Sequence, residues 1–239
     1  MRFNLLPGHQ SAYRANHSTE TALLSLFDDL LTTADAGDAS ALLLLDLSAA
    51  FDTVGHGILL NRLSRYFGLS DSALAWFRSY LSGRTQSVQI ENFTSSAASL
   101  PCGVPQGSVL GGPLFIMCVA PLAYVTATDG VIVRQFSDDS QACKRFALLP
   151  DLSAQLQCCN ALAQWAVKTN IWLTSNRVQL NISKSTLLYT STTRQAALVE
   201  SSSPLQVGSS LVYPSQEACN LGVVIDSHLS LAAHVQRTY

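Results

Sequence analysis

Residues 41–52 read ALLLLDLSAAFD, an apolar run that ends in the carboxylate of Asp46. A continuous apolar run of this kind is typical of a central strand that is covered on both faces. The same device returns in residues 131–141, VIVRQFSDDSQ, where Asp138 and Asp139 fall at a predicted bend between two strands. Carboxylates at the ends of buried strands are costly unless they are paired or bind a cation. These three acidic residues are therefore the first candidates for a functional site.

A glycine-rich loop, CGVPQGSVLGG at residues 102–112, lies between the two acidic elements. Taken alone it is weak support for a function, because a turn entering a helix with Ser108 as the N-cap explains it equally well. Taken together, the three pieces favour a two-metal phosphoryl-transfer site. In such a site two Mg²⁺ ions roughly 4 Å apart activate an attacking oxygen and stabilise a leaving one.

Structural roles remain open for the same carboxylates. Asp46 can cap a helix that follows the strand, and aspartate is common in hairpin turns because its side chain bonds the local backbone. Two adjacent aspartates fit a turn less well than one, since like charges repel. The same dipeptide at Asp28 and Asp29 falls on a predicted helix, where neighbouring side chains diverge, and we interpret that pair as solvated surface.

The composition indicates an apolar core with a thin polar shell. The chain has 239 residues, of which 48% are hydrophobic and 13% charged, against ~25% charged in typical domains. Its length allows one large domain or two small ones, and no linker divides it. The net charge of −2 is unusual for a protein that holds a nucleic-acid backbone. With three lysines and eleven arginines, phosphate contacts would come mostly from arginine.

The six cysteines show no spacing that would close a zinc site, which favours reduced thiols in an intracellular protein, nuclear or cytoplasmic. The N-terminus lacks the apolar core of a secretory signal. The stretch from Pro101 to Thr128 carries no charge and is long enough to cross a bilayer. Its many glycines and prolines favour a buried loop and helix over a membrane span.

Hydrophobic periodicity predicts the secondary structure along the chain. Helices are expected at 17–34, 58–68, 70–83 and about 150–168. Strands are expected at 41–47, 84–93, 130–136, 141–149 and 218–229, together with a strand that follows a polar turn at 181–184. Residues 190–210 are expected to form a loop or a weak hairpin.

Four segments, in order, resemble the motifs of reverse transcriptases. LLLLDLSAAFDTV resembles motif A, GVPQGSVLG motif B, FSDD the YADD-type motif C, and LNISKS motif D. The flanks QSAYR, HSTETALL and LGVVIDSHLSLAAHV look like those of LINE-type (non-LTR), jockey-like retrotransposon polymerases. The ordered occurrence of four motifs is far more specific than any one of them.

This resemblance implies an α+β right-hand polymerase palm, in which helices back an antiparallel sheet. Residues 1–40 would be partial fingers, 41–195 the palm with motifs A to D, and 196–239 the end of the palm towards a thumb that the chain lacks. It also implies RNA-directed DNA polymerase activity, with nucleotidyl transfer from a dNTP to a primer 3′-OH. The implied partners are an RNA template, a DNA primer and dNTP, with no membrane and no obligate protein partner.

The resemblance assigns roles to the acidic motifs. Asp46 and Asp138 would be the principal ligands of two Mg²⁺ ions, with Mn²⁺ as an alternative, and Asp139 the supporting carboxylate. The backbone carbonyl of Leu47 would complete the site of the nucleotide-bound ion. Phe51 would lie against the sugar of the incoming nucleotide, although a phenylalanine of the core is equally consistent with its position.

The remaining roles concern nucleotide and template. Gln106 and Gly107 would let the backbone approach both, because glycine has no Cβ. Lys184 would protonate or neutralise the departing pyrophosphate, and an exposed turn lysine is the alternative. Arg14 would contact template or triphosphate.

The chain departs from the family pattern at several positions. Phe136 and Ser137 stand where Tyr and Ala are usual, Gly55 stands where an Asp is common, and GGPLF replaces GPLLF. Such drift keeps two alternatives open: a catalytically inactive retrotransposon-derived fragment, and a domesticated nucleic-acid-binding module. A two-metal nuclease is disfavoured by the GVPQGS loop and Phe51.

Overall fold

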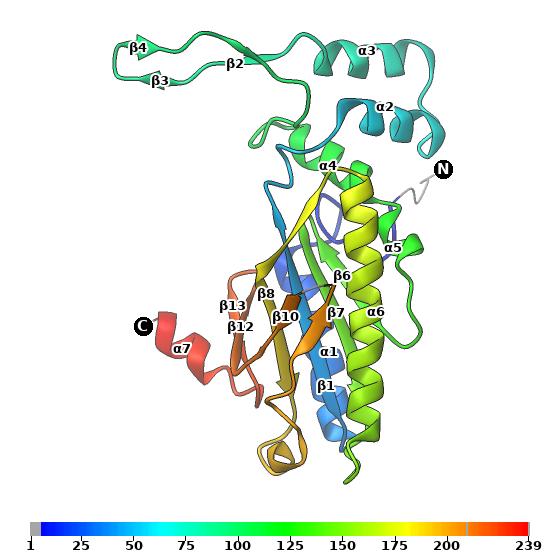
Figure 1. Ribbon diagram of the computed structural model, residues 1–239, viewed down its shortest axis with the longest axis vertical. Coiled ribbons are helices and arrows are strands. Elements are labelled where there is room, and N and C mark those ends of the chain that lie inside the picture. Colours follow the sequence, from blue (N-terminus) through cyan, green and yellow to red (C-terminus); the bar gives the residue numbers. More distant parts are fainter. Residues whose placement is uncertain (1–5, 209, 239) are drawn as a thin grey trace.

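A five-stranded mixed sheet is the centre of the computed structural model, which describes residues 6–208 and 210–238. The strand order is β11-β8-β1-β7-β6 (Figure 1). The strands are β1 (Ala39–Ser48), β6 (Ile132–Phe136), β7 (Asp139–Phe146), β8 (Gln179–Thr190) and β11 (Pro214–Ser215). All neighbours pair antiparallel except β11, which is parallel to β8. The expected palm-like antiparallel sheet is confirmed, with one short parallel strand at its edge.

The central strand β1 is covered on both faces, as its apolar run predicts. Alternate residues, from Ala39 to Leu45, pack against α6 (Ser153–Ser175), while Leu42 packs against α1 (Thr19–Asp35). The two helices lie on opposite faces of the sheet (Figure 1). The helix predicted from about 150 is confirmed and extends beyond its expected end.

Helix α1 begins where the sequence predicts. Ser18 is its N-cap and forms a reciprocal capping box with Thr21. Asp28 is exposed, as expected, but Asp29 forms an ion pair with Arg134 on β6. The interpretation of both aspartates as solvated surface is therefore wrong for Asp29, because α1 packs across the sheet and meets a strand that the local pattern does not reveal.

A second group of helices caps one end of the sheet (Figure 1). It comprises α2 (His56–Arg65), α3 (Asp71–Leu81), α4 (Gly111–Val119) and α5 (Leu122–Val125). The uncharged stretch forms the glycine-rich loop followed by the buried helix α4 and by α5, as expected, but before α4 the loop itself is buried only at Gly103 and Val104. No helix in the described part of the chain is long and apolar enough to span a bilayer.

The half-buried strand expected at 84–93 is wrong. These residues belong to a projecting hairpin arm, residues 84–100, made of β2 (Thr85–Gln86), β3 (Gln89–Ile90), β4 (Phe93–Thr94) and β5 (Ala98–Ser99) (Figure 1). Every residue of these four strands is exposed. Glu91 takes a positive φ of 53° and turns the chain back within the segment that the alternating pattern presents as continuous.

The single strand expected at 218–229 is also a hairpin, formed by β12 (Glu217–Asn220) and β13 (Val223–Asp226). Leu221 and Gly222, both with positive φ, make its two-residue turn. The weak hairpin expected within 190–210 is confirmed in kind by β9 (Leu205–Val207) and β10 (Ser210–Val212), preceded by a 3₁₀ turn at Ala196–Leu198. The described chain closes with α7 (Ala232–Thr238), which the sequence reading does not anticipate.

Candidate active site

Strand pairing brings the three aspartates to one end of the sheet. The last pair between β1 and β7 is Leu45 with Ser140, so Asp46 and Asp139 occupy the next positions on neighbouring strands. Asp138 lies in the two-residue turn that joins β6 to β7. Residues far apart in the sequence therefore approach each other because the antiparallel register dictates it.

The pKa of Asp139 reflects this proximity. Burial raises the pKa of its carboxyl from 3.8 to about 6, and the negative charges of Asp138 and Asp46 add to the effect. The residue keeps part of its solvent access, so this burial is partial. The ion pairs among the described residues, Arg134 with Asp29 and Arg237 with Glu217, do not reach this cluster. The three carboxylates thus form a repulsive group that a cation would relieve.

The donor chemistry suits a hard divalent cation, because carboxylate oxygens are the ligands that Mg²⁺ prefers. Asp46 and Asp139 line one cavity of about 100 Å³, and Asp138 is not among the residues that line it. Within the described ranges no group of three or more His, Cys, Asp or Glu side chains is placed to hold a metal ion. The fold brings two of the three carboxylates to one cavity and keeps the third on the adjacent turn.

Lys184 lines the same cavity as Asp46 and Asp139. Its position follows from a break in the β1–β8 ladder: Leu44 pairs with Thr186 and Asp46 pairs with Asn181. Residues 182–185 therefore oppose Leu45 alone and bulge out of the ladder. The polar turn expected at 181–184 is realised as this bulge within a continuous β8 and not as a turn that precedes the strand.

The glycine-rich loop is tied to the chain that follows β1. Gly103 N–H donates to the carbonyl of Val54 (2.8 Å), and Val104 N–H donates to the carbonyl of Phe51 (2.9 Å). Gly103 has φ +93°, and a Cβ at this position would lie 3.0 Å from the backbone oxygen of Asp52. Only glycine allows both the backbone conformation and the close approach.

Phe51 and Leu47 are placed by the hydrophobic core below this loop. The Phe51 ring stacks on Phe115, with centroids 4.7 Å apart and planes inclined by 26°, and the side chain is half-buried. The Leu47 side chain is buried, so only its backbone is available to a ligand. Phe51 has the packing of a core residue while part of it stays accessible beside the aspartate strand.

Gln106 and Gly107 are exposed at the tip of the loop. Gly107 has φ +80°, with open space where a Cβ would stand. The N-cap of α4 is Leu110 and not Ser108, the cap in the alternative that treats the loop only as a turn, although the Ser108 hydroxyl accepts a hydrogen bond from Gly111 N–H (3.0 Å). Pro113, shifted relative to the family pattern, sits in the first turn of α4, where no helical hydrogen bond is lost.

Arg14 is half-buried and fixes the segment before α1. Its Nη1 donates to the carbonyls of Pro7 (2.8 Å) and Gln10 (3.2 Å). The role expected from the resemblance, a contact with template or triphosphate, is not apparent in these contacts.

The same segment supplies a residue that sequence reasoning missed. Gln10 is 2% exposed, and its Oε1 accepts hydrogen bonds from the backbone N–H groups of Ser137 (3.0 Å) and Ala12 (2.9 Å). The N-terminal segment thereby holds the turn that carries Asp138. A single glutamine in a polar stretch gives no local signal of this contact.

A second missed feature is a buried amide pair beside the aspartates. Gln141 Nε2 donates to Asn220 Oδ1 (2.8 Å), which joins β7 to the β12–β13 hairpin. Both side chains line the cavity of Asp46 and Asp139. Gln141 Oε1 and Asn220 Nδ2 have no hydrogen-bond partner among the described residues.

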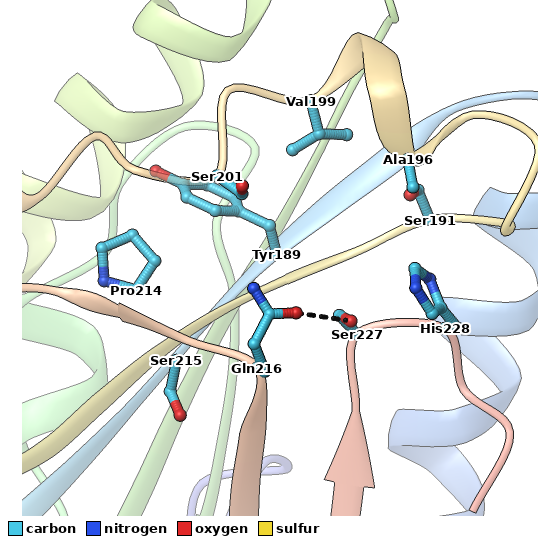
Figure 2. Close-up of a pocket in the computed structure, with 10 residues that line it drawn as sticks. All are labelled: Tyr189, Ser191, Ala196, Val199, Ser201, Pro214, Ser215, Gln216, Ser227 and His228. Atoms are coloured by element: carbon cyan, nitrogen blue, oxygen red, sulfur yellow. Dashed lines mark hydrogen bonds between the residues drawn. The ribbon is translucent and has the colours of Figure 1, made fainter.

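Another cavity, of about 180 Å³, lies where β8 meets β11 and the β12–β13 hairpin (Figure 2). Hydroxyl groups dominate its lining, and Ser227 donates a hydrogen bond to Gln216 across it (3.2 Å). His228 is its one titratable side chain besides Tyr189, and no carboxylate, lysine or arginine lines it. It lacks the carboxylates that a Mg²⁺ site requires, so the aspartate end of the sheet remains the candidate active site.

Solved structures share this fold. The apo telomerase from Candida Tropicalis truncated from its C-terminal domain superposes with a TM-score of 0.60 at 13% identity, covering 92% of this chain and 40% of that one. The telomerase from Candida albicans in complex with a TWJ fragment of telomeric RNA superposes with a TM-score of 0.55 at 14% identity, covering 92% and 34%. The fold defines the class: an α+β polymerase domain of the palm and partial-fingers type.

Sequence comparison identifies the family. The family model described as reverse transcriptase (RNA-dependent DNA polymerase) matches residues 1–225. The RNA-directed DNA polymerase from mobile element jockey of Drosophila funebris is 26% identical over 236 residues, covering 96% of this chain and 24% of that protein. The probable RNA-directed DNA polymerase from transposon X-element of Drosophila melanogaster is 28% identical over 238 residues, covering 97% and 24%.

The chain belongs to the reverse transcriptase family, as a domain of the non-LTR retrotransposon type. It spans about a quarter of the length of these curated relatives.

Proposed function

We propose that this chain catalyses RNA-templated DNA synthesis, in which a primer 3′-OH attacks the α-phosphate of a dNTP and pyrophosphate leaves. The observation that carries the proposal is the convergence of Asp46, Asp139 and Lys184 on one cavity, with Asp138 on the adjoining turn. Positioning of the reactants and neutralisation of charge supply most of the catalysis in such a reaction.

In this proposal Asp46 and Asp138 hold two divalent cations, Mg²⁺ or Mn²⁺, and Asp139 supports them. When bound, the cations activate the attacking oxygen and stabilise the leaving one. The backbone carbonyl of Leu47 supplies a further oxygen ligand. The raised pKa of Asp139, caused first by burial and then by the negative charges of Asp138 and Asp46, supports this assignment, because a bound cation would offset both effects.

The other residues act on substrate. Lys184 neutralises or protonates the departing pyrophosphate from its bulge above the aspartates. Phe51 contacts the sugar of the incoming nucleotide with the part of its ring that the core leaves accessible. Gln106 and Gly107 offer backbone to nucleotide and template, which the open space beside Gly107 supports. Arg14 acts on the template or triphosphate from the segment that it fixes.

Primer extension on poly(rA)·oligo(dT) with Mg²⁺ tests the proposal. The Asp138→Asn variant is expected to lose incorporation, because a neutral amide cannot replace a charged ligand. Asp28→Asn is the matched control, since Asp28 is exposed on α1 away from the cluster. Equal incorporation by the two variants would contradict the assignment of Asp138.

A nucleic-acid-binding module without turnover is the second candidate function. It is favoured by one observation: the described residues contain no preassembled group of three metal-binding side chains. Retained duplex binding with no incorporation by the unsubstituted chain would support it. Release of nucleotides from the labelled strand would instead indicate a nuclease.

A further inference from the structure

Helix α3 and the base of the hairpin arm carry a row of stacked planar groups outside the candidate active site. The rings of Trp76 and Tyr80 lie parallel, with centroids 5.5 Å apart and planes inclined by 9°. The guanidinium of Arg84 lies over the Tyr80 ring, 5.7 Å from its centroid, so a cation adjoins the ring pair. The spacing of four residues places the two rings on one face of α3, and Arg84 follows the turn that ends the helix.

This row is open to solvent at its Trp76 end. Trp76 is 53% exposed, although Phe77 meets it edge-on. Leu81 is fully buried, and Leu74, Phe77 and Tyr80 pack partly buried against the core. Helix α3 is therefore anchored to the core while Trp76 stays exposed. Trp76 thus presents a large exposed aromatic surface beside the parallel ring of Tyr80.

The local charge differs from that of the whole chain. Between residues 53 and 128 the charged residues are four arginines and two acids, whereas the full chain has a net charge of −2. The part of the molecule that carries α3 and the arm is therefore the cationic part of an otherwise acidic protein. A polyanion is the partner that this distribution favours.

We propose that the Trp76–Tyr80–Arg84 row is a stacking platform for single-stranded RNA. An unpaired base extends the row by stacking on Trp76, and Arg84 faces the phosphate backbone while its plane rests on Tyr80. Stacking of this kind tolerates any base, because every base has a π face. The inference rests on the proposed function in that a polymerase must hold the unpaired template outside its active site.

Single-stranded RNA fits this row better than a protein partner does. The row is a ladder of flat groups that ends in a cation, the pattern by which proteins bind unpaired nucleotides. The exposed apolar residues that would suit a protein partner, Val88, Ile90 and Phe93, belong to the β3–β4 part of the arm and not to the row. A contact between copies of the chain through this surface is one of the outcomes of the test.

The test uses the full chain and a fluorescein-labelled single-stranded oligo(rU) in EDTA, so that no divalent cation contributes. Fluorescence anisotropy gives the affinity of each variant. Trp76→Ala is expected to weaken binding about tenfold, the loss of one stacked base. Trp76→Phe should retain most of the affinity, and Arg84→Gln should reduce it. Tyr213→Ala is the matched control, because Tyr213 is an aromatic residue of similar exposure, 66%, on another element.

Tryptophan fluorescence distinguishes stacking on Trp76 from a purely structural role of this residue, because only stacking would quench its emission. Trp165 is buried and Trp172 lies under Arg62, so oligo(rU) should quench mainly Trp76. Quenching is expected in the unsubstituted chain and should be lost in Trp76→Phe. Quenching that persists in Trp76→Phe would overturn the proposal.

Three further outcomes are decisive. Equal loss of affinity in Trp76→Ala and Tyr213→Ala would overturn the platform, as would a Trp76→Ala variant that changes the sedimentation of the free chain and leaves RNA binding intact. Quenching of Trp76 by oligo(rU) in the Asp138→Asn variant would support the platform, even if the unsubstituted chain could not extend a primer. Failure of the platform and failure of the polymerase are thereby distinguishable.

Discussion

The carboxyl of Asp139 binds its proton more tightly in the folded protein than in the unfolded chain, because burial and two neighbouring carboxylates raise its pKa to about 6. Its favourable contribution to stability is present in full below pH 3.8 and is lost as the pH rises through about 6. Asp139→Asn removes the charge. The variant is therefore expected to gain stability over the unsubstituted chain across this pH window and to keep the gain above it.

The gain above pH 6 should be on the order of 1 kcal/mol, discounted for the solvent access of Asp139. For a chain of this size that corresponds to a rise in Tm of about 2 to 4 °C. Thermal melts from pH 4 to pH 8 without divalent cations, with Asp28→Asn as the control, measure it. A pH-independent difference would show that folding does not raise the pKa of Asp139.

Gly103 and Gly107 offer a matched pair for the glycine-rich loop. Both have positive φ, but only at Gly103 would a Cβ meet backbone, the oxygen of Asp52 at 3.0 Å. Gly107→Ala should cost about 1 kcal/mol through the left-handed conformation alone. Gly103→Ala should cost roughly 2 to 4 kcal/mol, because the loop must also move away from Asp52. Urea denaturation gives both free energies of unfolding. Equal losses would mean that a Cβ at position 103 does not force the loop away from Asp52.

At the scale of elements, the sequence predicts what local patterns encode. The leucine run defines β1, the SDDS bend defines the β6–β7 hairpin, and the Ser18 cap defines the start of α1. Once these strands pair, the meeting of Asp46 and Asp139 follows from the register. The part of the site that lies on two neighbouring strands could therefore be predicted from the sequence.

The rest of the site depends on contacts between distant segments. Gln10 bonds to Ser137, and Gln141 bonds to Asn220, because separate elements pack against each other. No periodicity in the sequence predicts either pair. The two hairpins that the sequence pattern predicts as single strands are missed for a related reason. Their turns use Glu91, or Leu221 with Gly222, and a non-glycine residue at positive φ carries little turn signal.

The Gln141–Asn220 hydrogen bond predicts an energetic coupling between β7 and the β12–β13 hairpin. Gln141→Met or Asn220→Leu alone leaves the partner amide buried without a bond and should cost about 1 to 3 kcal/mol. The double variant should cost less than the two single losses combined, by about 1 kcal/mol. Urea denaturation of the four proteins measures the coupling. Strict additivity would show that the two amides do not stabilise each other.

At the scale of the molecule, two parts differ in how they are held. The central sheet is covered by α1 on one face and α6 on the other, with side chains of β1 fully buried between them. The arm at residues 84–100 has two ladders of two residue pairs each, and its strand residues are all exposed. The aspartates lie at the end of the rigid part, whereas the proposed RNA platform lies at the base of the weakly held part.

Hydrogen exchange should reveal this division. Amide protons of residues 39–48 are expected to exchange only through global unfolding, at a cost of about 5 to 15 kcal/mol. Amide protons of the arm should exchange through local opening, many orders of magnitude faster, because few buried contacts oppose it. Exchange measured by mass spectrometry on peptides from the two segments compares them within one sample. Single-stranded RNA should slow exchange in residues 76–84, where the proposed platform lies, and leave 39–48 unchanged, since only the platform gains a partner. An arm protected as strongly as β1 in the free chain would contradict this division and would mean that another surface already covers it.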